Sequence, residues 1–156
     1  MKTLLILVGK TTDKHFQAGI SDYATRISHY MPFDIMTIPE LRNTKSLSEE
    51  QQKTTEGELI LKQLQPSDTA VLLDEHGKEY RSVEFGQWLS QKQQTARRLV
   101  FIIGGPYGFS PEVYVRANEK ISLSKMTFSH QMVRLIFTEQ LYRACTIIKG
   151  EPYHHE

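Results

Sequence analysis

The chain has 156 residues, of which 39% are hydrophobic and 24% are charged, and its formal net charge is +1 at pH 7. These values describe one ordinary globular domain and exclude a disordered, fibrous or strongly polycationic chain. Apolar runs such as residues 4–8 are far shorter than the roughly 20 residues of a membrane-spanning helix. Because no export signal is recognisable and Cys145 has no second cysteine to pair with, we expect a single domain, residues 1–156, in the cytoplasm with no membrane contact.

Short apolar segments and amphipathic segments alternate along the whole chain. Strands are expected at residues 3–8, 33–38, 69–73, 99–103 and 121–123. Helices are expected at residues 13–28, at 48–64, from a cap at Ser82, at 110–118 and at 130–149. Residues 40–47 read as a loop and 74–77 as a turn. This alternation predicts a parallel, doubly wound α/β sheet in one domain.

The near-neutral total conceals an uneven distribution of charge. Residues 1–78 carry 9 basic and 11 acidic side chains, whereas residues 79–156 carry 10 basic and 7 acidic ones. We therefore expect an anionic partner to meet the C-terminal half, although an uneven but solvated helix surface would produce the same count.

Three loops follow strand ends, where open α/β sheets bind their ligands. They come after Leu73, at residues 104–108 and at residues 123–129. The Gly104-Gly105 turn allows backbone to approach a ligand, but it also suits an ordinary tight turn. It is not the G-x-G-x-x-G of dinucleotide-binding folds and does not follow the first strand, which argues against a Rossmann dehydrogenase or methyltransferase.

His130 and Arg134 lie four residues apart at the head of the last predicted helix. A helix N-terminus and a nearby guanidinium both favour neutral imidazole, which suits a proton acceptor. The alternative is a capping or partly buried histidine beside a surface arginine.

The chain ends with an aromatic residue and imidazoles directly after this helix, in the sequence EPYHHE. Tyr153 and His154 could stack on an unpaired base and bind its edge, unless the end is simply frayed. We expect no metal site, because His154 and His155 are adjacent and no Cys or carboxylate cluster completes a ligand set. No nucleophile elbow is present either, and Cys145 reads as a small core residue.

Five segments together resemble one known family. They are LILVGK, LLDEHGKEYRS, FIIGGPYGFS, LSKMTFSHQMVRLIFTEQLYRA and GEPYHHE, in this order from Met1 to Glu156. In these segments the chain closely resembles the RlmH family, which are large-subunit (23S) rRNA (pseudouridine-N3)-methyltransferases of the SPOUT superfamily. The resemblance implies a single-domain α/β fold with a C-terminal trefoil knot, in contrast to the general absence of knots in proteins.

The resemblance also implies a cofactor, partners and site residues. The cofactor would be S-adenosyl-L-methionine, and the partners would be a second copy of the chain and ribosomal RNA within the ribosome, without DNA. The residues that would bind the cofactor come from the three strand-end loops: Leu73, Gly104, Gly105, Leu123, Ser124, Lys125, Met126, Thr127 and Phe128. The residues assigned to catalysis are His130 as proton acceptor, Arg134 as an anchor for a phosphate or carbonyl, and Tyr153 and His154 at the nucleotide in the partner's site.

Two positions depart from the family pattern, and two other functions remain open. Many members have proline where Ser129 stands and a basic residue where His155 stands.

The first rival function is a ribosome-binding protein without turnover. The second is a flavodoxin-like enzyme with a small substrate, for which residues 9–12 (GKTT) would be a weak phosphate cradle.

Overall fold

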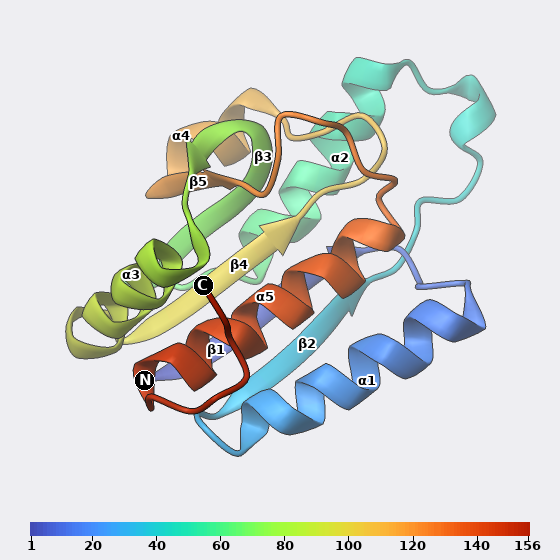
Figure 1. The fold of residues 1–156 in the computed structure, drawn as a ribbon. Helices are drawn as coiled ribbons and strands as arrows, with labels where there is room; N and C mark the ends of the chain where they lie inside the picture. Colours follow the sequence, from blue (N-terminus) through green and yellow to red (C-terminus); the bar gives the residue numbers. More distant parts are fainter.

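A five-stranded parallel sheet forms the centre of the protein in the computed structural model, which describes residues 1–156 (Figure 1). The strands are β1 (Lys2–Val8), β2 (Phe33–Ile38), β3 (Thr69–Glu79), β4 (Arg98–Ile103) and β5 (Glu119–Ser122). Their order across the sheet is β2-β1-β4-β3-β5, and every neighbouring pair is parallel. The helices are α1 (Lys14–Ser28), α2 (Glu49–Lys62), α3 (Ser82–Thr95), α4 (Pro111–Arg116) and α5 (Met132–Ile148), with a short 3₁₀ turn η1 (Thr44–Ser46).

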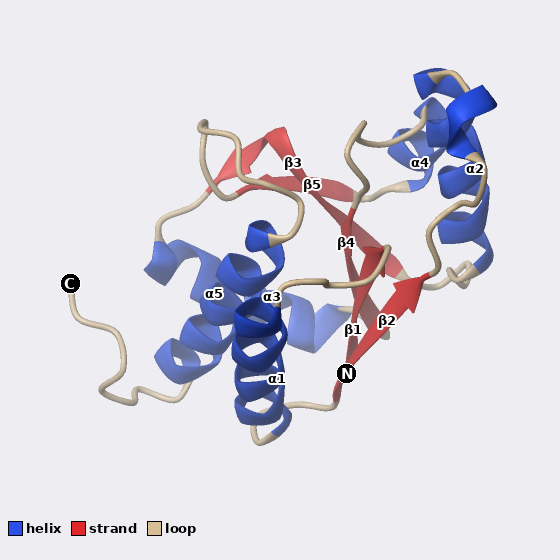
Figure 2. Ribbon diagram, turned by 90° about the vertical axis from the view of Figure 1, so that its right-hand side faces the viewer, coloured by secondary structure: helices blue, strands red, loops and turns tan.

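Helices cover both faces of the sheet, α1, α3 and α5 on one side and α2 and α4 on the other (Figure 2). Successive side chains of a strand point to opposite faces, so β1 contributes to two cores. Leu5 and Leu7 face the α5 side, while Leu4, Ile6 and Val8 face the α2 side. Continuous apolar strands are the expected consequence of a sheet buried on both faces, and the predicted parallel α/β class is confirmed.

Strand β3 is longer than expected, because the predicted turn at residues 74–77 lies within it. β3 pairs with β5 from Val71 to Leu73 and again from Lys78, and both Leu73 and Lys78 register with Ile121. Residues 74–77 therefore bulge out of the ladder between the two pairings. A Cβ on Gly77 would lie 2.7 Å from the backbone of Ile121, so glycine is what permits this close approach to β5.

Helix α5 begins two residues later than predicted, and Ser129 accepts hydrogen bonds from the N–H groups at its start. The Met132 N–H donates to Ser129 Oγ at 3.1 Å, and the Val133 N–H donates to the Ser129 carbonyl at 3.0 Å. Ser129 thus satisfies two N–H groups at the start of α5.

The segment of residues 123–131 leads from the edge strand β5 back to α5, which packs against both α1 and α3 (Figure 1). The family resemblance assigns the knot to the C-terminal segment of the chain, which would thread through a loop. The threading of this segment remains a prediction of the resemblance.

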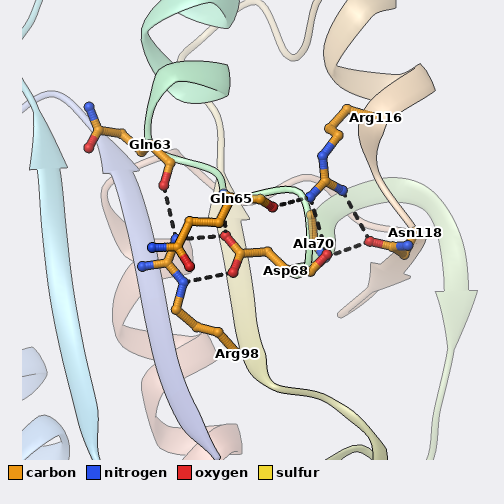
Figure 3. A network of polar contacts seen from close by, with 7 residues as sticks. All are labelled: Gln63, Gln65, Asp68, Ala70, Arg98, Arg116 and Asn118. Carbon is orange, nitrogen blue, oxygen red and sulfur yellow. Dashed lines mark hydrogen bonds and ion pairs between the residues drawn. The ribbon is translucent and has the colours of Figure 1, made fainter.

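A polar network joins the amino ends of β3 and β4 (Figure 3). These ends lie opposite the carboxyl ends of the strands, which the strand-end loops follow. The Asp68 side chain is fully buried and receives two hydrogen bonds from Arg98, at 2.8 and 2.6 Å, and one from the Gln65 N–H at 2.8 Å. Arg116 donates to the carbonyls of Gln65 and Asp68. Burial alone would raise the pKa of Asp68, but the bonds from Arg98 and Gln65 and the charges of Arg98 and Arg116 outweigh it and lower the pKa.

Asp68→Asn should destabilise the fold by about 3 kcal/mol at pH 7, because it leaves the Arg98 guanidinium partly buried without its counter-ion. The lowered pKa of Asp68 means that its stabilisation is complete above the unfolded pKa of about 4 and is lost as the pH falls through the folded pKa. Urea unfolding at several pH values should therefore show the two proteins converging below about pH 4. Asp22→Asn is the matched control, since its ion pair with Arg26 is exposed. An equal loss in both variants would contradict the assignment.

Candidate active site

A cavity of about 430 Å³ lies at the carboxyl ends of β3, β4 and β5. Cavities of this size accommodate small-molecule cofactors. All three strand-end loops singled out in the sequence contribute to its wall. The predicted residues that line it are Leu73, Gly104, Gly105, Leu123, Ser124, Met126, Thr127, Phe128 and His130.

A side chain at Gly104 or Gly105 would crowd the residues that pack behind the glycine loop after β4. A Cβ on Gly104 would lie 3.0 Å from the ring of Phe109, and a Cβ on Gly105 would lie 2.7 Å from Glu56 Oε1. The loop closes on itself through an antiparallel bridge between Gly105 and Gly108, where Gly108 has a φ of 82°. Glycine at these positions therefore lets the backbone itself form part of the cavity wall.

Glu56 of α2 supports this loop with a buried carboxylate. The residue is 5% exposed, its Oε2 accepts a hydrogen bond from Gln52 at 3.1 Å, and its Oε1 has no hydrogen-bond partner. Burial raises the pKa of Glu56 above its ordinary value, and the nearby charge of Glu40 adds to this effect, while the bond from Gln52 opposes it. The buried carboxylate of Glu56, with one oxygen unpaired, therefore lowers the stability of the fold.

Glu56→Gln should stabilise the protein by about 1 kcal/mol near pH 7, because it removes a buried charge with an unpaired oxygen. Since the folded pKa of Glu56 is raised, wild-type and variant should be equally stable below the unfolded pKa of about 4 and diverge as the pH rises through the folded pKa. Thermal unfolding across pH 4 to 8 tests this, with the exposed Glu58→Gln as control. A difference that does not depend on pH would refute the electrostatic explanation.

The rim of the cavity carries two carboxylates that link the loops. Asp74 and Glu75 lie in the β3 bulge. Tyr114 of α4 donates its hydroxyl to Asp74, and Thr127 donates to Glu75 at 3.1 Å. Burial and then the bond to Asp74 raise the pKa of Tyr114. An acidic rim suits a cationic ligand such as a sulfonium compound better than a phosphate.

His130 lies on the rim of this cavity, half-buried, in the turn that precedes α5. Its side chain makes no hydrogen bond within the chain, while its carbonyl accepts from Arg134 Nε at 3.0 Å. The imidazole is therefore available to a substrate that approaches the cavity.

Arg134 occupies a different position from the one expected of a substrate anchor. Its side chain is fully buried and donates to the carbonyls of Val8 and Gly9, at 2.7 and 2.9 Å, and to Thr11 Oγ1 at 2.9 Å. Burial lowers its pKa. Because these donors are directed at the loop after β1, Arg134 holds that loop against α5 and presents no face to a phosphate.

The loop after β1 likewise makes hydrogen bonds within the protein. The Thr12 N–H donates to Gln131 Oε1 at 2.9 Å, and Gln131 Nε2 donates to the Lys10 carbonyl at 3.0 Å. With Arg134 bound to the Gly9 carbonyl as well, residues 9–12 do not form a phosphate cradle. This removes the support for the flavodoxin-like alternative.

The C-terminal tail leaves the end of α5 and turns back along the helix, where Tyr153 bonds to Glu139 in its middle (Figure 1). The 17 residues of α5 span about 25 Å at 1.5 Å per residue. Tyr153 and His154 are not among the residues that line the cavity of their own chain, and Lys125 is exposed outside its lining.

Several residues of the cavity were not among the predicted site residues. They are Asp74, Glu75 and His76 in the β3 bulge and Tyr107, Phe109 and Tyr114 around the glycine loop. The polar run directly after a buried strand was a usable signal for the first three. No local pattern marks Tyr114, which reaches Asp74 from a helix 40 residues away.

The cavity fits S-adenosylmethionine in size, in its glycine wall and in its acidic rim. No group of three or more His, Cys, Asp or Glu side chains is arranged to hold a metal ion. None of the helices combines the length and hydropathy needed to cross a membrane.

Comparison with known proteins identifies the relatives of this chain. The family model described as "Predicted SPOUT methyltransferase" matches residues 1–154. Proteins named "Ribosomal RNA large subunit methyltransferase H" are 64% identical in Phocaeicola vulgatus and 55% identical in Porphyromonas gingivalis, each over 157 aligned residues and the full length of both chains. The protein of that name from Christiangramia forsetii is 58% identical over 99% of each chain. The chain belongs to the SPOUT methyltransferase family.

Proposed function

We propose that this protein uses S-adenosylmethionine to methylate N3 of a pseudouridine in large-subunit ribosomal RNA, in the cytoplasm. This proposal rests on the cavity at the carboxyl ends of β3, β4 and β5. The cavity has a glycine wall, an acidic rim and His130 at its mouth. The relatives' name, ribosomal RNA large subunit methyltransferase H, supplies the substrate class.

The residues of the cavity divide the work between binding and proton transfer. The backbone at Gly104 and Gly105 and the segment 123–128 would hold the cofactor, and the rim carboxylates of Asp74 and Glu75 would suit its positive charge. When bound, S-adenosylmethionine supplies a methyl group that forms a bond to N3 while the sulfur keeps the electrons of the broken S–C bond. Positioning of N3 in line with that bond supplies most of the acceleration.

His130 accepts the N3 proton as the methyl group is transferred. Its imidazole lies at the cavity mouth and has no hydrogen-bond partner within the chain. A neutral imidazole near physiological pH is a suitable acceptor for an imide proton.

His130→Ala should lower kcat for rRNA methylation by about 100-fold or more, which is the usual contribution of a general base. Cofactor affinity, measured by calorimetry, should change less than about threefold, since the glycine wall and rim are untouched. His29→Ala on the far end of α1 is the matched control. Wild-type turnover by His130→Ala at saturating cofactor would show that another group takes the proton.

The working unit is a homodimer in which the tail of one copy completes the cavity of the other. Tyr153 and His154 are bound to Glu139 and Arg143 of α5, yet neither residue lines the cavity of its own chain. In a closed twofold dimer every contact between the copies occurs twice, so a tail that reaches the partner's cavity completes both sites in the same way. We assign the tail residues to the target nucleotide in the partner's site.

Recognition of the substrate depends on assembled RNA shape. A single domain with a formal net charge of +1 has too few phosphate contacts to select one nucleotide by charge. Folded RNA is recognised through its shape and its unstacked bases. The intact ribosome, which presents a fixed arrangement of such groups, is therefore the expected substrate.

Labelled S-adenosylmethionine offered in parallel to ribosomes, separate subunits and naked rRNA tests the substrate. Label should enter assembled ribosomes at least about tenfold faster than naked rRNA, and mass spectrometry should locate it on N3 of a pseudouridine. Equal labelling of naked rRNA would overturn shape recognition. No labelling of any RNA, with the cofactor still bound, would favour a ribosome-binding protein without turnover.

A further inference from the structure

The C-terminal tail, residues 151–156, follows a defined path along its own helix α5. The Glu151 N–H donates to the Thr146 carbonyl at 3.0 Å, and Tyr30 donates its hydroxyl to Glu151 Oε2 at 2.6 Å. That bond is the main cause that raises the pKa of Tyr30 to about 12, so the phenol stays protonated and able to donate. The first residue of the tail is thus held at two points.

An ion pair within α5 holds the next part of the tail. Arg143 Nη2 lies 2.6 Å from Glu139 Oε1, and each side chain is less than a quarter exposed. Tyr153 donates its hydroxyl to the same Glu139 oxygen at 3.0 Å, while the Arg143 guanidinium stacks 4.8 Å from the centre of its ring. Tyr142 contacts that ring edge-on at 4.7 Å. One face of the Tyr153 ring and its hydroxyl are therefore engaged by α5 itself.

The same arginine determines which nitrogen of His154 carries the proton. Arg143 Nη1 lies 3.0 Å from His154 Nδ1. A guanidinium only donates hydrogen bonds, so Nδ1 has to be the accepting nitrogen. The proton of the neutral imidazole then resides on Nε2, which faces away from this contact.

We propose that Glu139 and Arg143 are positioning residues that set Tyr153 and the Nε2–H form of His154 for the target pseudouridine. This inference depends on the proposed function of the tail. Loss of the N3 proton places negative charge on the carbonyl oxygens on either side of N3. An N–H donor already directed at one of these oxygens stabilises that charge without reorganisation.

The choice of substitutions distinguishes this positioning role of Glu139 and Arg143 from a purely structural role of their ion pair. Arg143→Lys keeps the charge and the ion pair with Glu139, but a single ammonium does not reproduce the fork that reaches both Glu139 and His154. Arg143→Gln and Glu139→Gln remove the pair. Arg26→Gln is the matched control, because its guanidinium stacks on the neighbouring Tyr142 ring at 5.5 Å without contacting the tail.

Steady-state methylation of ribosomes, cofactor binding and ¹⁵N spectra of labelled histidine measure the effect in the full-length protein. We expect kcat of Arg143→Lys, Arg143→Gln and Glu139→Gln to fall by about tenfold or more, with cofactor Kd within about twofold of wild type and Arg26→Gln unchanged. The wild-type spectrum should show an unprotonated His154 Nδ1, and Arg143→Gln should show a mixture of both tautomers.

Three results would overturn the proposal. They are a protonated Nδ1 of His154 in the wild type, full turnover by Arg143→Gln, and full turnover by Arg143→Lys with an unchanged His154 spectrum. If a glutamine variant unfolds, the lysine variant and the wild-type spectrum still decide. Failure of the wild-type protein to methylate any RNA would instead refute the proposed function. The His154 spectrum does not depend on methylation, so the two failures are distinguishable.

Discussion

Deletion of residues 151–156 should leave cofactor binding intact and reduce rRNA methylation by about 1,000-fold, because the nucleotide loses its positioning groups while the cavity keeps all of its lining. The tail packs along α5, and none of its residues lines the cavity of its own chain. Isothermal titration with cofactor and labelled-methyl transfer to ribosomes measure the two properties separately. A Tyr30→Phe variant, which weakens only the anchor of Glu151, is the milder control.

Mixed dimers test whether the tail acts in its partner's site. One copy carries His130→Ala with an intact tail, and the other carries the wild-type cavity without residues 151–156. If the tail works across the dimer, each mixed dimer has one complete site, so an equal mixture should recover about a quarter of wild-type activity after exchange of subunits. If the tail acts on its own cavity, no complete site exists and the mixture stays inactive. That outcome would also remove the basis for the shared site.

Arg134→Met should lower the free energy of unfolding by about 4 kcal/mol, because the carbonyls of Val8 and Gly9 lose charge-assisted hydrogen bonds in a buried position. Methionine matches the length of the arginine stem and fills much of its volume, so the loss reports the hydrogen bonds more than a cavity. Chemical denaturation measures it. The matched control is Arg97→Met, an exposed arginine just before β4, which should cost less than about 0.5 kcal/mol.

The same substitution distinguishes the two roles considered for Arg134. If the guanidinium holds the loop after β1, Arg134→Met should lose stability while the folded fraction keeps a KM for ribosomes within about threefold of wild type. A stable variant with a strongly raised KM would restore the role of substrate anchor that the sequence suggested. The burial of this side chain and its four hydrogen bonds within the chain favour the first outcome.

Local patterning was sufficient for the elements and for the place of the cavity. Strand and helix alternate in the structure as the hydrophobic spacing predicts, and the segments after Leu73, Ile103 and Ser122 meet at one edge of the sheet. This succeeds because side-chain periodicity reports directly on burial, and because the carboxyl ends of parallel strands lie together whatever else the fold does. The bulge at residues 74–77 was mistaken for a turn, since its glycine and polar residues suit both.

By itself, the sequence determined a parallel α/β sheet, a glycine loop at its carboxyl edge and, through resemblance, membership of a methyltransferase family. Only the tertiary structure decided which partners the buried charged side chains of α2 and α5 contact. Arg134 is bound to carbonyls about 125 residues away, Glu56 supports Gly105 from another helix, and Arg143 faces the tail rather than solvent. Spacing along one helix shows which residues share a face, but the partner that a buried charge finds depends on which segment packs against that face.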